Sequence, residues 1–208
     1  MPDVAQAPDG PFRGYRADAA GREIEFLEAG VGDPLLVLGG SGGPALALLA
    51  TKWRVIAPDL AAAGLADATA REQAAAAGAV ADSLGLGPCD VLAAAAHTEA
   101  ALWRAADAPA RVRSIVLESP PHPGPELCAA LPGIRAPALV LLGTRADAGP
   151  PAAGVTCHQL LPGAFLTFVY DAGHDVRGDR PGAFAAVVSD FLTRQGRFLA
   201  RDGAERAP

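Results

Sequence analysis

The histidine in the segment YDAGHDVRGDRPGAF is the side chain in this sequence best suited to proton transfer. His174 follows an apolar run, FLTFVY, and comes directly after Gly173, which allows a sharp backbone turn. Such a turn would direct the imidazole across the end of the preceding strand. Because imidazole titrates near neutral pH, it can act as a general base. The alternative is a loop histidine without a role.

An acid that could orient this imidazole ends the segment LVLLGTRAD. A carboxylate that accepts the imidazole N–H fixes the tautomer and stabilises the imidazolium. Asp147 is the first candidate, and Glu118, at the end of RVRSIVLE, is the fallback. Asp147 could instead cap a turn or a helix. We predict a His174–Asp147 dyad.

A glycine-rich loop follows the apolar run PLLVL and contains Gly40, Ser41 and Gly42. Glycines expose backbone N–H groups, which can bind an anion or a carbonyl oxygen. As a bare GxSxG pattern the loop would make Ser41 a nucleophile. Its position before the run RVIAPDL favours an oxyanion-binding loop instead. A purely structural turn is the third interpretation.

No pattern in the sequence indicates a cofactor or a metal. The glycines do not form GxGxxG, and no GK[ST] phosphate loop is present. The cysteines, Cys89, Cys128 and Cys157, are odd in number and far apart, so neither a disulfide framework nor a zinc site is expected. No His, Asp or Glu cluster has metal-ligand spacing.

The elements that must position these residues alternate along the chain. Continuous apolar runs such as PLLVL, CDVLAAA, SIVLE and ALVLLG are typical of strands covered on both faces. Two alternating segments, 12–17 and 23–28, predict an antiparallel pair at a sheet edge, and helices are expected at 44–50, 71–84, 98–107 and 181–195. This predicts one α/β domain over 1–208, a mostly parallel sheet with helices on both faces and flexible ends at 1–10 and 197–208.

The order of these segments resembles the α/β-hydrolase family over residues 12–195. In that family a strand ending like DLVGHSMGG presents a nucleophilic serine at the tip of a tight strand-to-helix turn. The resemblance implies that His174 is the general base, that Asp147 orients it, and that the loop 40–42 supplies oxyanion donors. The usual histidine of that loop is replaced by Gly39.

The expected serine is missing from the matching segment, DVLAAAAHTEAALW. The nucleophile position falls on Ala95, or on Ala96 after a one-residue shift, and neither side chain can attack a carbonyl. Another register places His97 at the tip. In each register His97, Thr98 and Glu99 are expected to face the mouth of the pocket, and Ala96 and His97 are expected to contribute to the oxyanion or substrate-binding site. Because His97 and Thr98 replace the usual glycines, we expect the strained turn to have relaxed.

The segment 119–137 is short where many members of the family insert a helical cap. We therefore expect the cap to be absent or minimal. The pocket would then be shallow, or completed by a partner or by a second subunit, which leaves a homodimer open.

Charge and hydropathy exclude several classes of protein. The net charge of −6, with no basic cluster, argues against nucleic-acid binding. No apolar stretch approaches the roughly 18 residues of a membrane span, and the N-terminus does not resemble a signal peptide. A cytoplasmic protein is expected. Abundant Ala, Gly and Pro, with Lys52 as the only lysine, indicate the coding bias of a high-GC bacterium.

Three functions are consistent with these residues. The first, which we favour, is a small-molecule tailoring enzyme of secondary metabolism that uses the His174–Asp147 dyad without an acyl-enzyme. It would catalyse isomerisation, elimination, cyclisation or hydrolysis by activated water. The second is an ester or thioester hydrolase with Ser41 or His97 as a displaced nucleophile. The third is an inactive pseudoenzyme that binds a small molecule or a partner protein.

Overall fold

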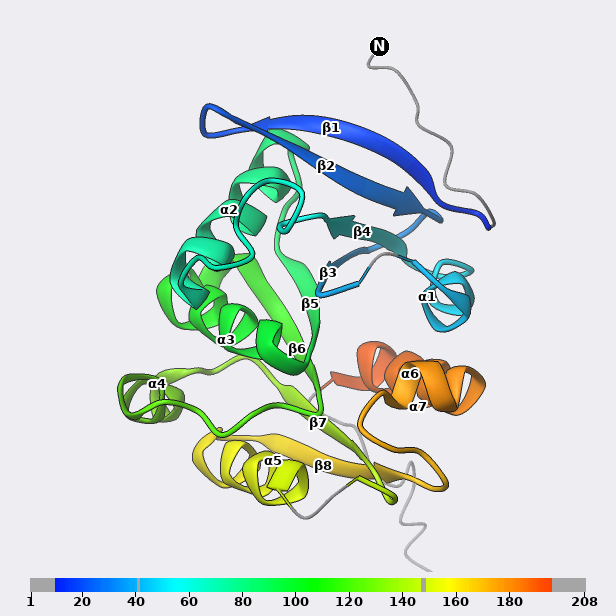
Figure 1. Cartoon of the computed structure of the whole chain (residues 1–208), viewed down its shortest axis with the longest axis vertical. Helices are drawn as coiled ribbons and strands as arrows, with labels where there is room; N and C mark the ends of the chain where they lie inside the picture. The colour runs from blue at the N-terminus through cyan, green and yellow to red at the C-terminus, as the bar shows by residue number, and fades with distance from the viewer. Residues whose placement is uncertain (1–9, 41, 147–148, 196–208) are drawn as a thin grey trace, which may run out of the picture.

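The computed structural model describes residues 10–40, 42–146 and 149–195. Their strands form one eight-stranded sheet in the order β1-β2-β4-β3-β5-β6-β7-β8 (Figure 1). The edge pair β1 (Arg13–Ala19) and β2 (Arg22–Ala29) is antiparallel, and β2 also runs antiparallel to β4 (Arg54–Pro58). All other neighbouring strands are parallel. The predicted α/β class, with a mostly parallel sheet, is confirmed.

The remaining strands are β3 (Pro34–Leu38), β5 (Cys89–Ala94), β6 (Val112–Glu118), β7 (Ala138–Gly143) and β8 (Ala164–Val169). The α-helices are α1 (Pro44–Leu49), α2 (Ala70–Ser83), α3 (Thr98–Asp107), α4 (Pro125–Ala130), α5 (Gly149–Leu160), α6 (Val176–Asp179) and α7 (Pro181–Arg194). Three short 3-10 helices are η1 (Ala95–His97), η2 (Pro109–Arg111) and η3 (Leu131–Gly133).

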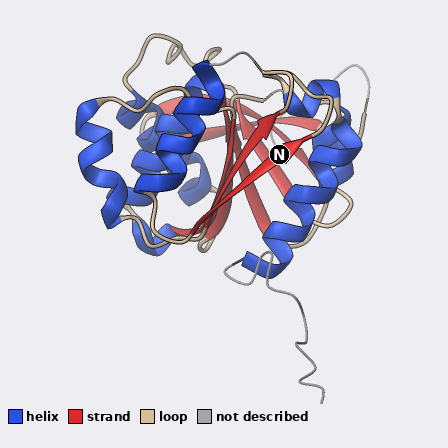
Figure 2. Ribbon diagram, turned by 90° about the horizontal axis from the view of Figure 1, so that it is seen from below, coloured by secondary structure: helices blue, strands red, loops and turns tan. Residues whose placement is uncertain are grey.

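Helices cover both faces of the sheet, as Figure 2 shows. On one face α2, α3, α4 and α5 pack over the sheet, and on the other α1, α6 and α7 do so. Successive side chains of β3 alternate between these two cores: Leu36 and Leu38 enter the first, Leu35 and Val37 the second. Because both faces are covered, each position of the strand favours an apolar residue. This explains the unbroken apolar runs in the sequence.

The helix α2 starts and packs in a way that its sequence explains. The Thr69 hydroxyl accepts the Glu72 N–H at 3.3 Å, while the Glu72 carboxylate accepts the Thr69 N–H at 2.8 Å, which is a capping box. Small residues such as Ala74, Ala77 and Ala81 form its buried face. Small size, more than a strong apolar stripe, therefore lets α2 lie close to the sheet.

Between β6 and β7 the chain forms only α4 and η3, which have six and three residues. The Glu126 carboxylate of α4 pairs with Arg71 of α2 at 2.5 Å, and the Arg71 guanidinium lies 3.7 Å from the Trp103 ring centroid. These contacts attach the segment to the body of the domain. This short segment agrees with the prediction that the cap is absent or minimal.

None of the helices formed by the described residues combines the length and the apolar character needed to cross a membrane.

Candidate active site

The loops that carry the predicted functional residues all follow the carboxyl ends of parallel strands. The glycine loop follows β3, Ala95 follows β5, Glu118 ends β6, and His174 follows β8. In a parallel sheet these ends meet along one edge, where ligands bind in open α/β folds. The contacts described below join the loops after β3, β5, β6 and β8.

The strand-to-helix turn after β5 contains a residue in the left-handed region. Ala95 has a φ of 48°, which a residue with a Cβ adopts only at some cost. The chain then passes through η1 into α3, and the Thr98 hydroxyl donates to the Ala95 carbonyl at 2.6 Å.

The expectation that this turn has relaxed is therefore wrong. His97 and Thr98, which stand where glycines were expected, have φ values of −77° and −63°. Those are right-handed helical angles open to any residue. The strained residue is Ala95 itself, so the loss of glycines downstream leaves the sharp turn intact.

His97 lies half-buried against the glycine loop. A Cβ added at Gly39 would come within 2.5 Å of the His97 Nδ1, and Gly39 has a φ of 77°. Burial lowers the pKa of His97, and the positive charge of Arg177 lowers it further, although a hydrogen bond to the Ala94 backbone opposes both. Burial and the charge of Arg177 both favour the neutral form of the imidazole.

The glycine loop is shaped by its neighbours on both sides. A Cβ at Gly40 would lie 2.8 Å from Nη1 of Arg177, while one at Gly42 (φ 100°) would only touch the Phe12 ring at 3.4 Å. Gly39 and Gly40 are thus required for the close approach of His97 and Arg177. Ser41 lies outside the described residues.

Arg177 is a site residue that the sequence predictions do not include. Its Nε lies 3.2 Å from Oε2 of Glu118, its main-chain N–H donates to the same carboxylate at 2.9 Å, and its Nη2 donates to the Gly39 carbonyl. The two side chains of the pair are 18% and 2% exposed. Glu118 ends a strand directly after the apolar run 115–117, where an ionised carboxylate is stabilised by a nearby cation, and this was the available signal.

Glu118 is buried at this edge as the partner of Arg177. Burial raises the pKa of Glu118 to about 7, although the charge and the N–H of Arg177 act in the opposite direction. The fallback acid therefore contacts the residue three positions after His174. Neither of these contacts involves the His174 ring.

Ser119 ties the His174 loop to β6 and is likewise absent from the sequence predictions. It is buried, has a φ of 47°, and its hydroxyl donates to the His174 carbonyl at 2.7 Å. The His174 side chain is exposed at the strand ends. Asp147, its predicted partner, lies outside the described residues.

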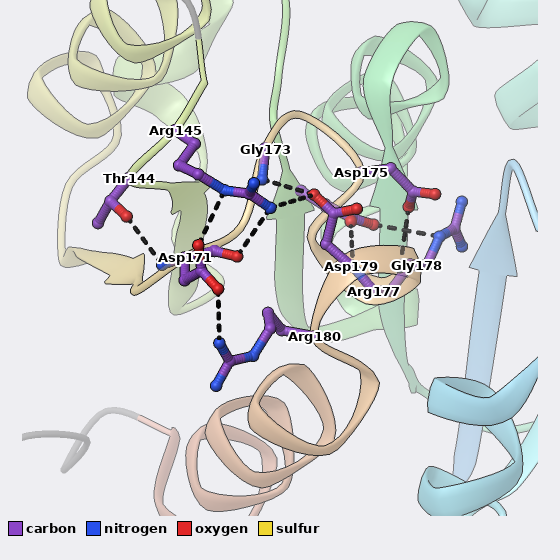
Figure 3. Close-up of polar contacts among 10 residues, drawn as sticks. Thr144, Arg145, Asp171, Gly173, Asp175, Arg177, Gly178, Asp179 and Arg180 are labelled. Atoms are coloured by element: carbon purple, nitrogen blue, oxygen red, sulfur yellow. Dashed lines mark hydrogen bonds and ion pairs between the residues drawn. The ribbon is translucent and has the colours of Figure 1, made fainter.

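A network of polar contacts joins the loop after β7 to the loop that carries His174 (Figure 3). Arg145 Nε pairs with Asp171 Oδ1 at 3.1 Å, and the Asp171 N–H donates to the Thr144 hydroxyl at 3.0 Å. Within the second loop, Asp179 accepts the Gly173 N–H at 2.7 Å. These contacts connect the two segments that flank the predicted dyad.

In the parts of the chain that the structure describes, no group of three or more His, Cys, Asp or Glu side chains could hold a metal ion.

Gly143 allows the two loops to approach each other. A Cβ there would collide with the backbone oxygens of Ala172 and Gly173, so Gly143→Ala must displace the segment before His174. We expect Gly143→Ala to lower the free energy of unfolding by about 1–3 kcal/mol. Gly182→Ala is the control: its Cβ meets nothing within 4 Å, and a gain of about 0.4–1 kcal/mol is expected. Urea unfolding of both variants measures this; equal effects would contradict the steric argument.

The architecture matches that of solved hydrolases, although no family model and no curated protein matches the sequence. A predicted CIB-like hydrolase from Thermoplasma acidophilum superposes with a TM-score of 0.76 at 18% identity, covering 91% of this chain and 99% of that one. The enol-lactonase from Burkholderia xenovorans LB400 superposes with a TM-score of 0.74 at 19% sequence identity, and the match covers 86% of this chain and 100% of that one. Carboxylesterase CesB from Bacillus subtilis superposes with a TM-score of 0.74 at 17% sequence identity, and the match covers 89% of this chain and 92% of that one. The chain therefore has the α/β-hydrolase fold.

Proposed function

We propose that the protein is an enzyme that acts on a small-molecule carbonyl compound, with His174 as general base and without an acyl-enzyme. Asp147 would orient the imidazole, and the N–H groups of Gly40 and Ala96 would bind the substrate oxygen. The observation that carries this proposal is the left-handed backbone of Ala95. A methyl group stands at the tip of a strained turn that, in the family the sequence resembles, presents the nucleophile.

The retained strain is informative because it costs stability. A non-glycine residue in the left-handed region costs on the order of 1–3 kcal/mol, and such residues cluster at functional sites. With alanine at the tip, the turn cannot present a nucleophile. In the family that the sequence resembles, the N–H that follows such a turn is an oxyanion donor, and here that N–H belongs to Ala96. The proposed site would thus have an oxyanion donor without a nucleophilic hydroxyl.

The chemistry that fits these groups starts with proton abstraction. The His174 imidazole takes a proton from the carbon next to the substrate carbonyl, and the C–H electron pair forms an enolate. The enolate oxygen accepts hydrogen bonds from the N–H groups of Gly40 and Ala96. The imidazolium then returns the proton to another atom of the substrate. In isomerisation the proton returns to a different carbon. In elimination the enolate expels a substituent from the neighbouring carbon, and this group takes the proton as it leaves. In cyclisation the enolate carbon attacks a second carbonyl group of the same substrate, and the alkoxide that forms takes the proton. Activation of a water molecule by the same base would give hydrolysis.

The lowered pKa of His97 argues against its use as a cationic group, and its half-buried ring lies beside Gly39 of the glycine loop. Hydrolysis with Ser41 or His97 as nucleophile, and ligand binding without catalysis, are the two alternative functions that the experiments below separate from the first.

Hydrogen–deuterium exchange at the carbon next to the carbonyl tests the proposal on a range of candidate substrates. A panel of small ketones, lactones and thioesters is incubated with the protein in D₂O, and loss of the α-proton signal is followed by NMR. We expect exchange for at least one class, reduced about 10²–10⁴-fold in His174→Ala. His122→Ala, which alters an exposed loop histidine, is the control and should retain the rate. Full exchange by His174→Ala would exclude this base.

A further inference from the structure

The peptide group between Gly39 and Gly40 is held from one side by Arg177. The Arg177 Nη2 donates to the Gly39 carbonyl, a contact between residues 138 positions apart in the sequence. Gly39 has a φ of 77°, and a glycine peptide of this kind can rotate at little steric cost. The orientation of this peptide therefore depends on the hydrogen bond to its oxygen.

The orientation of the carbonyl fixes the orientation of the N–H. The peptide bonds of the described residues are all trans, and in a trans peptide the C=O and the N–H of the next residue point in opposite directions. With the Gly39 oxygen turned toward Arg177, the Gly40 N–H points away from it. Among the described residues, none accepts a hydrogen bond from this N–H. A donor is thus left free beside the turn of Ala95 and His97.

We propose that Arg177 is a positioning residue that locks the Gly39–Gly40 peptide so that the Gly40 N–H faces a substrate oxygen. The inference rests on the proposed function, which uses this N–H as an oxyanion donor. Arg177 does not touch the substrate in this arrangement, because it lies on the opposite side of the peptide.

The guanidinium is well anchored for this task. Nε pairs with the buried Glu118 carboxylate at 3.2 Å, and the Arg177 main-chain N–H donates to the same carboxylate at 2.9 Å. Nη1 lies beneath Gly40, buried and without a hydrogen-bond partner among the described residues. The bond to Gly39 and the pair with Glu118 therefore hold the guanidinium through two of its three nitrogens. The Arg177 bond to the Gly39 carbonyl links the loop after β3 to the loop that carries His174.

The amide resonance of Gly40 reports the lock directly. In ¹⁵N-labelled protein we expect Arg177→Met to shift or broaden this resonance, as the peptide samples a second orientation. Arg177→Lys, which can still donate to the Gly39 oxygen, should largely restore it. Arg16→Met, on the exposed β1–β2 hairpin, should leave it unchanged. An unaltered Gly40 resonance in folded Arg177→Met would overturn the proposal.

Because Arg177→Met leaves Glu118 buried without its cation, the single variant could fail to fold. The double variant Glu118→Gln with Arg177→Met removes both charges and supplies the same readout. Thermal unfolding of each variant separates a local change at Gly40 from a general loss of structure.

A rate measurement shows whether the donor acts on a reacting oxygen. In a protein carrying Ala95→Ser, a fluorophosphonate reports nucleophile, base and oxyanion donors together. Loss of one oxyanion donor typically costs about 10²–10³-fold. We expect Arg177→Met to slow phosphonylation by about that factor and Arg177→Lys to recover part of it.

The two proposals fail in different ways. If His174→Ala keeps the full rate of α-proton exchange, while the Gly40 resonance depends on Arg177, the proposed function is wrong and the lock stands. If Ala95→Ser reacts equally fast with and without Arg177, the lock is wrong and the proposed function stands.

Discussion

The Ala95→Ser substitution is expected to make the protein react covalently with a fluorophosphonate, to which the unaltered chain should be inert. The left-handed backbone at Ala95 would present the new hydroxyl at the tip of the turn after β5. His174 would take the hydroxyl proton as the oxygen–phosphorus bond forms and fluoride leaves. The mass of the intact protein should rise by that of the phosphonyl group, and peptide mapping should place the adduct at position 95.

Dependence on His174 distinguishes an assembled site from a merely exposed hydroxyl. Adding His174→Ala to Ala95→Ser should lower the labelling rate about 10²–10⁴-fold, the usual contribution of a general base. Adding His122→Ala instead should leave the rate unchanged. Equal labelling with and without His174 would mean that this imidazole does not reach the tip of the turn.

The same reagent tests the register of the turn. Ala96→Ser places a hydroxyl one residue further along, at the exposed second position of η1, and is expected to stay inert. Faster labelling of Ala96→Ser than of Ala95→Ser would move the tip to position 96. Labelling of the unaltered chain at Ser41 or His97 would favour a hydrolase with a displaced nucleophile.

The fold could be predicted because local patterns determine its elements. Strands such as β3 are covered on both faces, so their sequences are continuous apolar runs, and α3 spans the residues 98–107 that its sequence predicts. The parallel direction of most strands follows from the alternation of helices and buried strands, since parallel neighbours require crossover connections. The place of the His174 loop at one edge of the sheet follows from this shared direction.

The contacts that shape the candidate site could not be predicted in this way, because they join distant residues. The Arg177 bond to Gly39 spans 138 positions, and the Ser119 bond to the His174 carbonyl spans 55. No periodicity carries that information. The expectation for the turn at Ala95 fails for a different reason. Missing glycines imply a relaxed backbone only at residues that need a positive φ, and His97 and Thr98 do not need one.

Glu118 should make the protein less stable as the pH rises. Its pKa in the folded protein is raised from 4.5 to about 7 by burial, so between these values the folded state binds the proton more tightly than the unfolded state. The free energy of unfolding then falls with increasing pH over this window. The difference of about 2.5 pH units (7 − 4.5) corresponds to roughly 3 kcal/mol, complete above about pH 7.

Glu118→Gln tests this because glutamine cannot ionise. Urea unfolding of both proteins at pH 4.5, 6 and 8 gives the difference in unfolding free energy, from which the titration of all other groups cancels. That difference should shift by about 3 kcal/mol in favour of the variant between pH 4.5 and pH 8. Glu126→Gln, at a side chain that is 73% exposed, should show little such shift. A constant difference for Glu118→Gln would mean that Arg177 keeps the buried carboxylate ionised throughout. In that case the ion pair holds the glycine loop equally firmly at every pH tested.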